Sequence, residues 1–175
     1  MLADHCDLRS LATGRPGLTP SKGASLAEAA AVCLKACGHT SPVDLQVHGD
    51  REVIRKLVWH DASVQDRDTY ADIPEATEEG ACAVALSVIE STLGMVVMER
   101  SRKNSAFDYW LGDEPGAMMQ RKARLEVTGI LHGDVAAVQR RLAEKLERYS
   151  KYPDASRAMV AVVEFGTPQA IVVTK

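Results

Sequence analysis

Hydrophobic residues recur with a helical period in three stretches of the chain, residues 26–37, 78–93 and 135–150. Each stretch follows a residue that can cap a helix N-terminus, namely Ser25, Thr77 and Asp134. Gly38 and Gly94 come directly after the first two stretches, where glycine commonly ends a helix. The pattern therefore predicts three helices. In the last of them, the basic residues are expected to point largely outward: Arg140, Arg141, Lys145 and Arg148.

Alternating apolar and polar positions predict strands elsewhere. Residues 43–59 alternate on both sides of the turn residues Gly49 and Asp50, which predicts a two-stranded hairpin. Further strands are predicted at residues 95–99, 107–111, 123–131, 158–165 and 170–175. From residue 77 the order is helix, three strands, helix, strand. We therefore expect an α/β fold, in which a mixed β-sheet is flanked by helices and this core is preceded by an N-terminal helix and a β-hairpin.

Composition indicates an ordinary globular chain. Residues 1–24 contain Gly, Pro and Ser without periodicity, so we expect a loosely ordered leader, followed by a single domain over residues 25–175. A hydrophobic content of 46% suits one well-filled core. The net charge of -3 does not indicate a general polyanion binder, so any contact with nucleic acid requires a local basic patch.

Cysteine usage and hydropathy bear on location. The chain has 4 cysteines and no charged segment followed by an apolar one at its start, so we expect a reduced, cytoplasmic protein. No apolar run approaches the roughly 20 residues that span a bilayer, so no membrane association is expected. Cys33, Cys37 and His39 form a C-x3-C-x-H cluster, which we interpret as core packing because no second ligand pair completes a zinc site.

Three acidic residues stand where apolar residues are expected. Asp108 interrupts one predicted strand and Glu126 another. Alternation places Asp108 on the same strand face as Trp110, and Glu126 on the face of Arg124. Glu78, rather than Glu79, lies on the apolar side of its helix and points toward the sheet.

These acids have two interpretations. Each can be solvated or paired with a neighbouring arginine, and an acid in the first turn of a helix also favours the helix dipole. Alternatively, Glu78, Asp108 and Glu126 converge on one point and form a divalent-cation site, since hard carboxylate oxygens suit Mg2+ or Mn2+.

With these acids in place, residues 77–165 resemble the core of the PD-(D/E)XK, or restriction-endonuclease-like, nuclease superfamily. That family has the same element order, a metal-binding Asp in the second strand and an E-x-K motif in the third. The resemblance implies Glu78 as the accessory helix acid and Asp108 and Glu126 as ligands of Mg2+ or Mn2+. It also implies a hydrolase that cleaves phosphodiester bonds in nucleic acid, within a nucleic-acid-processing or defence system.

The chain departs from the family motif at Thr128, which stands where the family has its lysine. That lysine helps to orient the attacking water and stabilises the phosphate. Lys122 is a candidate for its catalytic role on the same strand face, although it stands roughly 13 Å upstream along the strand. Lys145 on the following helix is the other candidate, provided that it faces the sheet.

Basic residues lead into both acid-bearing strands. Such flexible cations hold backbone phosphates, so a DNA-binding or RNA-binding channel beside the acids is one interpretation. Solubility alone is the other. The candidate nucleic-acid-binding residues are Arg100, Arg102, Lys103, Arg121 and Arg124.

Three hypotheses about function remain open at this point. The first is a Mg2+-dependent nuclease. The second, favoured by Thr128, is a non-catalytic subunit of the same fold that binds nucleic acid or serves as a scaffold in a larger protein complex. In the third, the acids pair with Arg124 and its neighbours and are purely structural. A homo-oligomer is compatible with all three.

Overall fold

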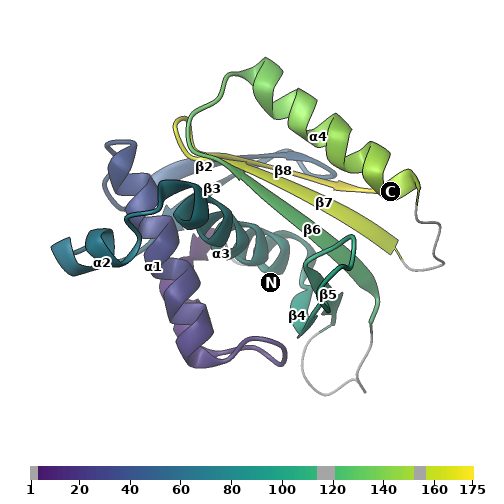
Figure 1. Cartoon of the computed structure of the whole chain (residues 1–175), viewed down its shortest axis with the longest axis horizontal. Helices are drawn as coiled ribbons and strands as arrows, with labels where there is room; N and C mark the ends of the chain where they lie inside the picture. Colours follow the sequence, from purple (N-terminus) through teal and green to yellow (C-terminus); the bar gives the residue numbers. More distant parts are fainter. Residues whose placement is uncertain (1–3, 114–120, 152–156) are drawn as a thin grey trace.

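The computed structural model describes residues 4–113, 121–151 and 157–175. Its centre is a mixed sheet of eight strands in the order β1-β3-β2-β8-β7-β6-β5-β4 (Figure 1). The strands are β1 (His5–Asp7), β2 (Val43–Gly49), β3 (Val53–Val58), β4 (Val96–Arg100), β5 (Tyr109–Gly112), β6 (Ala123–Ile130), β7 (Arg157–Glu164) and β8 (Gln169–Thr174). The prediction of an α/β fold with a mixed sheet and flanking helices is confirmed.

Helices cover both faces of this sheet. Figure 1 shows α4 on one face and α1 and α3 on the other. The larger apolar core lies against α1 and α3, and a smaller one lies beneath α4. The helical elements are η1 (Leu8–Thr13), α1 (Pro20–Ala36), α2 (Val64–Thr69), α3 (Ile73–Leu93) and α4 (Val135–Ser150).

The predicted element order from the second long helix onward is present. Helix α3 is followed by β4, β5 and β6, then by α4 and β7. Strands β4, β5 and β6 form an antiparallel series, and β7 lies parallel to β6 after the α4 crossover. The two predicted hairpins, β2 with β3 and β7 with β8, are also antiparallel pairs.

The expectation of a loosely ordered leader is wrong for its described part. Strand β1 pairs with β3 at the sheet edge, and η1 buries Leu8 and Leu11 completely in the main core. Residues 15–18 then follow the opposite edge strand, where the Gly17 N–H donates to the Val97 carbonyl over 3.0 Å. These elements are too short to show a hydrophobic period, so the pattern along the chain does not reveal them.

Two helices begin earlier than predicted. The N-cap of α1 is Thr19 rather than Ser25, and the N-cap of α3 is Asp72 rather than Thr77. Thr77 lies inside α3, where its hydroxyl donates to the Ile73 carbonyl over 2.7 Å. Proline in the first turn of both helices has no N–H to leave unpaired, so each helix extends back to an earlier cap.

The predicted stop of α3 is confirmed, because Gly94 has a left-handed backbone with φ of 67°. The three residues of the C-x3-C-x-H cluster pack separately: Cys33 is fully buried in the core, whereas a ring nitrogen of His39 lies 2.9 Å from the Phe165 carbonyl. No described helix is both long enough and apolar enough to cross a membrane.

Candidate functional site

Strand β6 extends beyond its neighbour β5, which pairs with it only between Ala123 and Leu125. The remainder of that β6 edge has backbone N–H groups with no strand beside them. Two carboxylates take the place of the absent strand: Asp108 Oδ2 accepts from the Val127 N–H over 2.8 Å, and Glu78 Oε2 accepts from the Gly129 N–H over 3.3 Å. The acids therefore satisfy backbone donors at a sheet edge.

Asp108 lies just before β5 rather than inside it, which corrects the predicted strand at residues 107–111. Its own N–H donates to the Leu125 carbonyl over 2.7 Å, and its carboxylate reaches along the β6 edge to Val127. Asp108 lines the same pocket as the adjacent Tyr109, so the expected alternation with Trp110 does not extend to Asp108, which lies outside the strand. The side chain therefore lies at the strand edge.

Glu78 reaches the same edge from α3 because the helix packs tightly against β6. Gly129 makes this approach possible, since an added Cβ at that position would overlap the Thr77 carbonyl of α3. Glu78, not Glu79, contacts β6, as the helical wheel indicates; Glu79 pairs with Lys22 over 2.7 Å.

A small pocket of about 210 Å³ lies beside these two acids. Its lining residues include Glu78, Asp108, Arg100 and Cys82. Arg100 Nη1 lies 3.4 Å from Asp108 Oδ1, which provides a cation at the rim. Burial raises the pKa of the Cys82 thiol to about 12, and the nearby Asp108 charge adds to the effect. The thiol is thus protonated near neutral pH and does not supply a nucleophile.

Glu126 lies on the other side of β6, toward α4. Its carboxylate accepts from Lys145 Nζ over 2.6 Å, Arg148 lies 3.9 Å away, and its side chain is only 9% exposed. Burial raises the pKa of Glu126 and the charge of Asp108 raises it further, whereas Lys145 and Arg148 lower it. A buried carboxylate with adjacent cations is the result.

The three predicted acids lie around one strand segment, but they do not share one ligand set. Asp108 and Glu78 occupy the open edge of β6 and line one pocket, whereas Glu126 contacts α4. Within the described ranges, no group of three His, Cys, Asp or Glu side chains is close enough to hold a metal ion. The described residues therefore do not show the expected convergence of the three acids on a single ion.

Lys122 does not lie beside Glu126. It precedes β6, and its ammonium pairs with Asp113. The lysine next to Glu126 is Lys145, from the helix that follows the strand.

The basic face of α4 was predicted to point largely outward, and this is wrong for Lys145 and Arg141. Arg141 Nη1 donates to Thr128 Oγ1 over 3.1 Å, so Thr128 also has a cationic partner. Together with Arg148, these residues follow an i, i+4, i+7 spacing, which places side chains on one helix face. This spacing is the feature of the sequence from which a polar contact between α4 and β6 could have been predicted.

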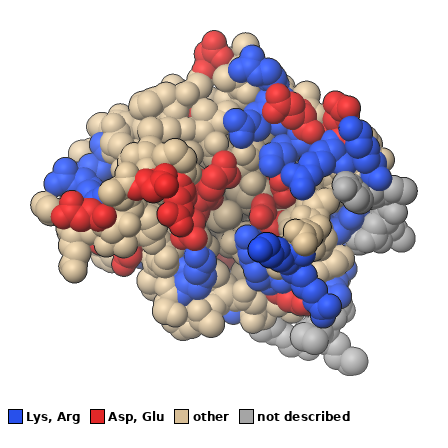
Figure 2. Space-filling model, in the orientation of Figure 1, with Lys and Arg blue, Asp and Glu red and all other residues tan. Residues whose placement is uncertain are grey.

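The candidate nucleic-acid-binding residues differ in exposure. Figure 2 shows Lys and Arg side chains concentrated on the side of the molecule that carries α4, β4 and β5. Arg100, Arg102, Lys103 and Arg121 are wholly or largely exposed, although Arg121 pairs with Glu99 over 2.7 Å. Arg124 is only 5% exposed and its guanidinium lies against the Phe107 and Tyr149 rings. It is therefore a buried structural residue and not a surface phosphate ligand.

Comparisons with known proteins identify no relative: no family model, no curated protein and no solved structure matches the chain.

Proposed function

We propose that the chain is a metal-dependent nuclease-like protein whose site lies where β6 emerges from its pairing with β5. The observation that carries this proposal is the contact of Lys145 Nζ with Glu126 Oε1 at 2.6 Å. In the family that residues 77–165 resemble, a lysine beside the strand glutamate helps to orient water. Lys145 supplies that cation from α4, so Thr128 does not by itself exclude the chemistry.

Carboxylate oxygens in this region suit Mg2+ or Mn2+. Asp108 and Glu126 would hold the ion, and Glu78 would act as the accessory acid. When bound, such an ion lowers the pKa of a water molecule and stabilises charge on a phosphate. Asp108 lies at the open edge of β6 and Glu126 on the α4 side, so binding one ion requires Asp108 to release the Val127 N–H and turn toward Glu126. Lys145 contacts Oε1 of Glu126 and would keep that contact while Oε2 turns to the ion.

Exposed cations complete the proposed substrate channel. Arg100 lines the pocket that contains Asp108, and Arg102 and Lys103 follow it in the loop after β4. Positive side chains at this spacing attract a phosphate backbone without reading its sequence. The substrate class is nucleic acid, in a processing or defence system.

A non-catalytic binding or scaffolding subunit is the second candidate, because the Glu126 charge is already offset by Lys145 and Arg148 in the conformation described. Both candidates bind nucleic acid, but only the nuclease cleaves it.

The test compares two lysines. Purified protein is incubated with plasmid and with single-stranded DNA and RNA in Mg2+ or Mn2+, and Lys145→Ala is compared with Lys122→Ala. We expect Lys145→Ala to reduce cleavage by about a hundredfold or more, which is the effect of removing one group that stabilises developing charge. Lys122→Ala is the matched control and should cleave like the wild type.

Thermal melts with and without Mn2+ separate the remaining outcomes. Metal-dependent stabilisation that Asp108→Asn abolishes, without any cleavage, favours the non-catalytic subunit. Absence of both cleavage and stabilisation by metal contradicts a metal site of either kind.

A further inference from the structure

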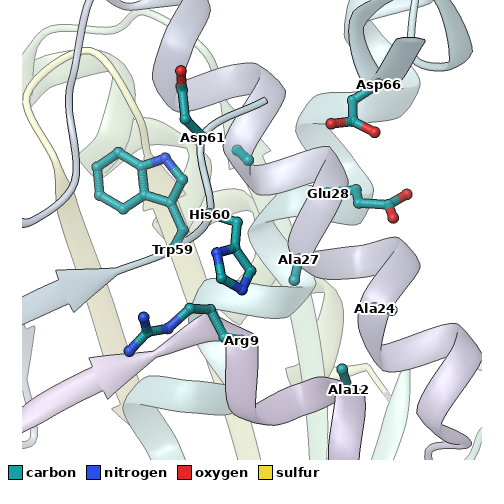
Figure 3. A pocket seen from close by; sticks show the side chains of 10 residues that line it. Arg9, Ala12, Ala24, Ala27, Glu28, Trp59, His60, Asp61 and Asp66 are labelled. Carbon is teal, nitrogen blue, oxygen red and sulfur yellow. The ribbon is translucent and has the colours of Figure 1, made fainter. Parts of the chain in front are cut away.

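A second pocket lies on the α1 side of the sheet, away from the acids of β6. It has a volume of about 230 Å³ and is enclosed by η1, α1, α2 and the segment after β3 (Figure 3). Its apolar wall combines the Trp59 ring with alanines from η1 and α1: Ala12, Ala24, Ala27 and Ala31. For scale, a dry cavity of about 150 Å³ holds benzene. The pocket therefore has room for an aromatic ring with a short side arm.

Trp59 provides an unused polar group at this wall. The residue is only 4% exposed, and its indole N–H has no hydrogen-bond acceptor among the described residues. Figure 3 shows the indole nitrogen on the edge of the ring that faces α1. An unpaired buried donor is costly, and tryptophan N–H groups usually have a partner when buried. This nitrogen has almost no exposed surface and an ammonium cannot accept a hydrogen bond from it, so Trp59 contributes to the pocket through its apolar ring.

The charge around the rim is unevenly compensated. Arg9 binds Asp7 through two nitrogens at 2.8 and 2.7 Å, and Lys35 binds Asp61 over 2.7 Å. Both pairs are therefore neutral within the protein.

Two rim acids are left over. Glu28 and Asp66 line the pocket, and neither has a Lys or Arg ion-pair partner in the part of the chain that the structure describes. Asp66 accepts the Ser63 N–H over 2.7 Å as part of a capping box, which leaves its charge in place. The rim consequently has a net negative charge.

We propose that this pocket binds a small organic cation, specifically an aromatic or branched alkyl amine. The apolar body of the ligand packs on the alanines and on the face of Trp59, and the ammonium lies between Glu28 and Asp66. An anionic ligand is disfavoured, because the one arginine of the rim is already bound to Asp7. This site is independent of the proposed nuclease site.

The test uses three probes of similar size and different charge: 2-phenylethylamine, 2-phenylethanol and 3-phenylpropanoate. The chain has two tryptophans, so Trp110→Phe leaves Trp59 as the only indole fluorophore. We expect saturable quenching or enhancement of that fluorescence by the amine with a Kd of about 1 mM or tighter, as suits a ligand of this size. The neutral probe should bind at least about fivefold more weakly, and the anion more weakly still.

Two variants locate the site in the same background. Ala27→Leu fills the pocket from α1 and should abolish binding. Glu28→Gln combined with Asp66→Asn keeps size and capping ability and should reduce amine affinity to that of the neutral probe. Unchanged thermal melts show that both variants are folded; if Ala27→Leu melts early, Ala24→Leu replaces it.

The proposal is overturned if the amine gives no saturable signal, or if the three probes bind equally well. Amine binding that survives both the leucine and the double substitution overturns it as well.

Discussion

The two faces of β6 are built from different chemistry. Toward α1 and α3 the strand presents Ala123, Leu125 and Val127, all within the main apolar core. Toward α4 it presents Arg124, Glu126 and Thr128, each of them buried and each in contact with residues of α4.

The difference shows how one strand can hold two helices by unlike means. The α3 contact depends on shape, because Gly129 lets the helix backbone approach and neighbouring apolar side chains fill the space. The α4 contact combines an apolar part over β7 and β8 with a polar seam over β6. On the first face, the effect of a substitution on the free energy of unfolding should therefore depend on side-chain volume. On the second face, it should depend on charge and hydrogen bonding.

The largest effect is expected from Leu125→Ala on the apolar face. Leu125 is 0% exposed, so the change removes buried methyl groups and leaves a cavity. We expect the free energy of unfolding to fall by about 2–5 kcal/mol, measured by urea denaturation. Thr128→Val on the opposite face is the control, and it should cost about 1 kcal/mol because it removes one hydrogen bond to Arg141. Equal losses in the two variants would contradict the distinction between the faces.

Lys145→Met should give the largest effect on the polar face. The change removes a charged hydrogen-bond donor but leaves Arg148 at 3.9 Å from the buried Glu126 carboxylate, so we expect a loss of about 1–3 kcal/mol at pH 7. Lys151→Met is the matched control, since Lys151 pairs with Glu147 in solvent and such pairs contribute about 0–1 kcal/mol. A loss no greater than that of the control would mean that the polar seam adds nothing to the attachment of α4.

Gly129→Ala tests the close approach of α3 to β6. The added methyl group meets the Thr77 carbonyl, so we expect the helix to shift and stability to fall by about 1–3 kcal/mol. The shift should also withdraw Glu78 from the Gly129 N–H. Faster hydrogen exchange of that amide, measured by NMR relative to the Val127 amide, checks the displacement. If both stability and amide exchange are unchanged, the β6–α3 contact accommodates the added methyl group without loss of free energy, and the prediction is wrong.

The smallest effect is a change in pH dependence from Glu126→Gln. Because burial raises the pKa of Glu126, the folded protein binds this proton more tightly than the unfolded chain does. The contribution of Glu126 to stability therefore declines as pH rises from the ordinary glutamate value through the raised pKa. Glutamine has no such titration, so the variant should gain stability relative to the wild type across that window.

The measurement is a series of denaturant melts of both proteins from about pH 4 to pH 8, spanning the reference pKa of glutamate. A difference that is flat with pH, or that grows in favour of the wild type, would mean that the Lys145 contact outweighs the burial of Glu126.

Local pattern determined most of the long elements. The helical period and Gly94 predict the end of α3, Asp134 caps α4 as expected, and alternation around short turns predicts both hairpins. These features depend on residues close together in sequence, so a single sequence contains the information that specifies them. The three acids were also identified as exceptional from sequence alone, although whether they bind metal remains a prediction.

Tertiary structure decided where those acids point. Asp108 leaves the expected strand face because β5 begins only at Tyr109, one residue after it. Glu126 pairs with Lys145 because α4 packs over this part of β6. The burial of Leu8 and Leu11 likewise depends on pairing between β1 and β3, about fifty residues apart in the chain. Periodicity records which side of its own element a residue occupies, whereas the partner on that side is selected by packing between distant segments.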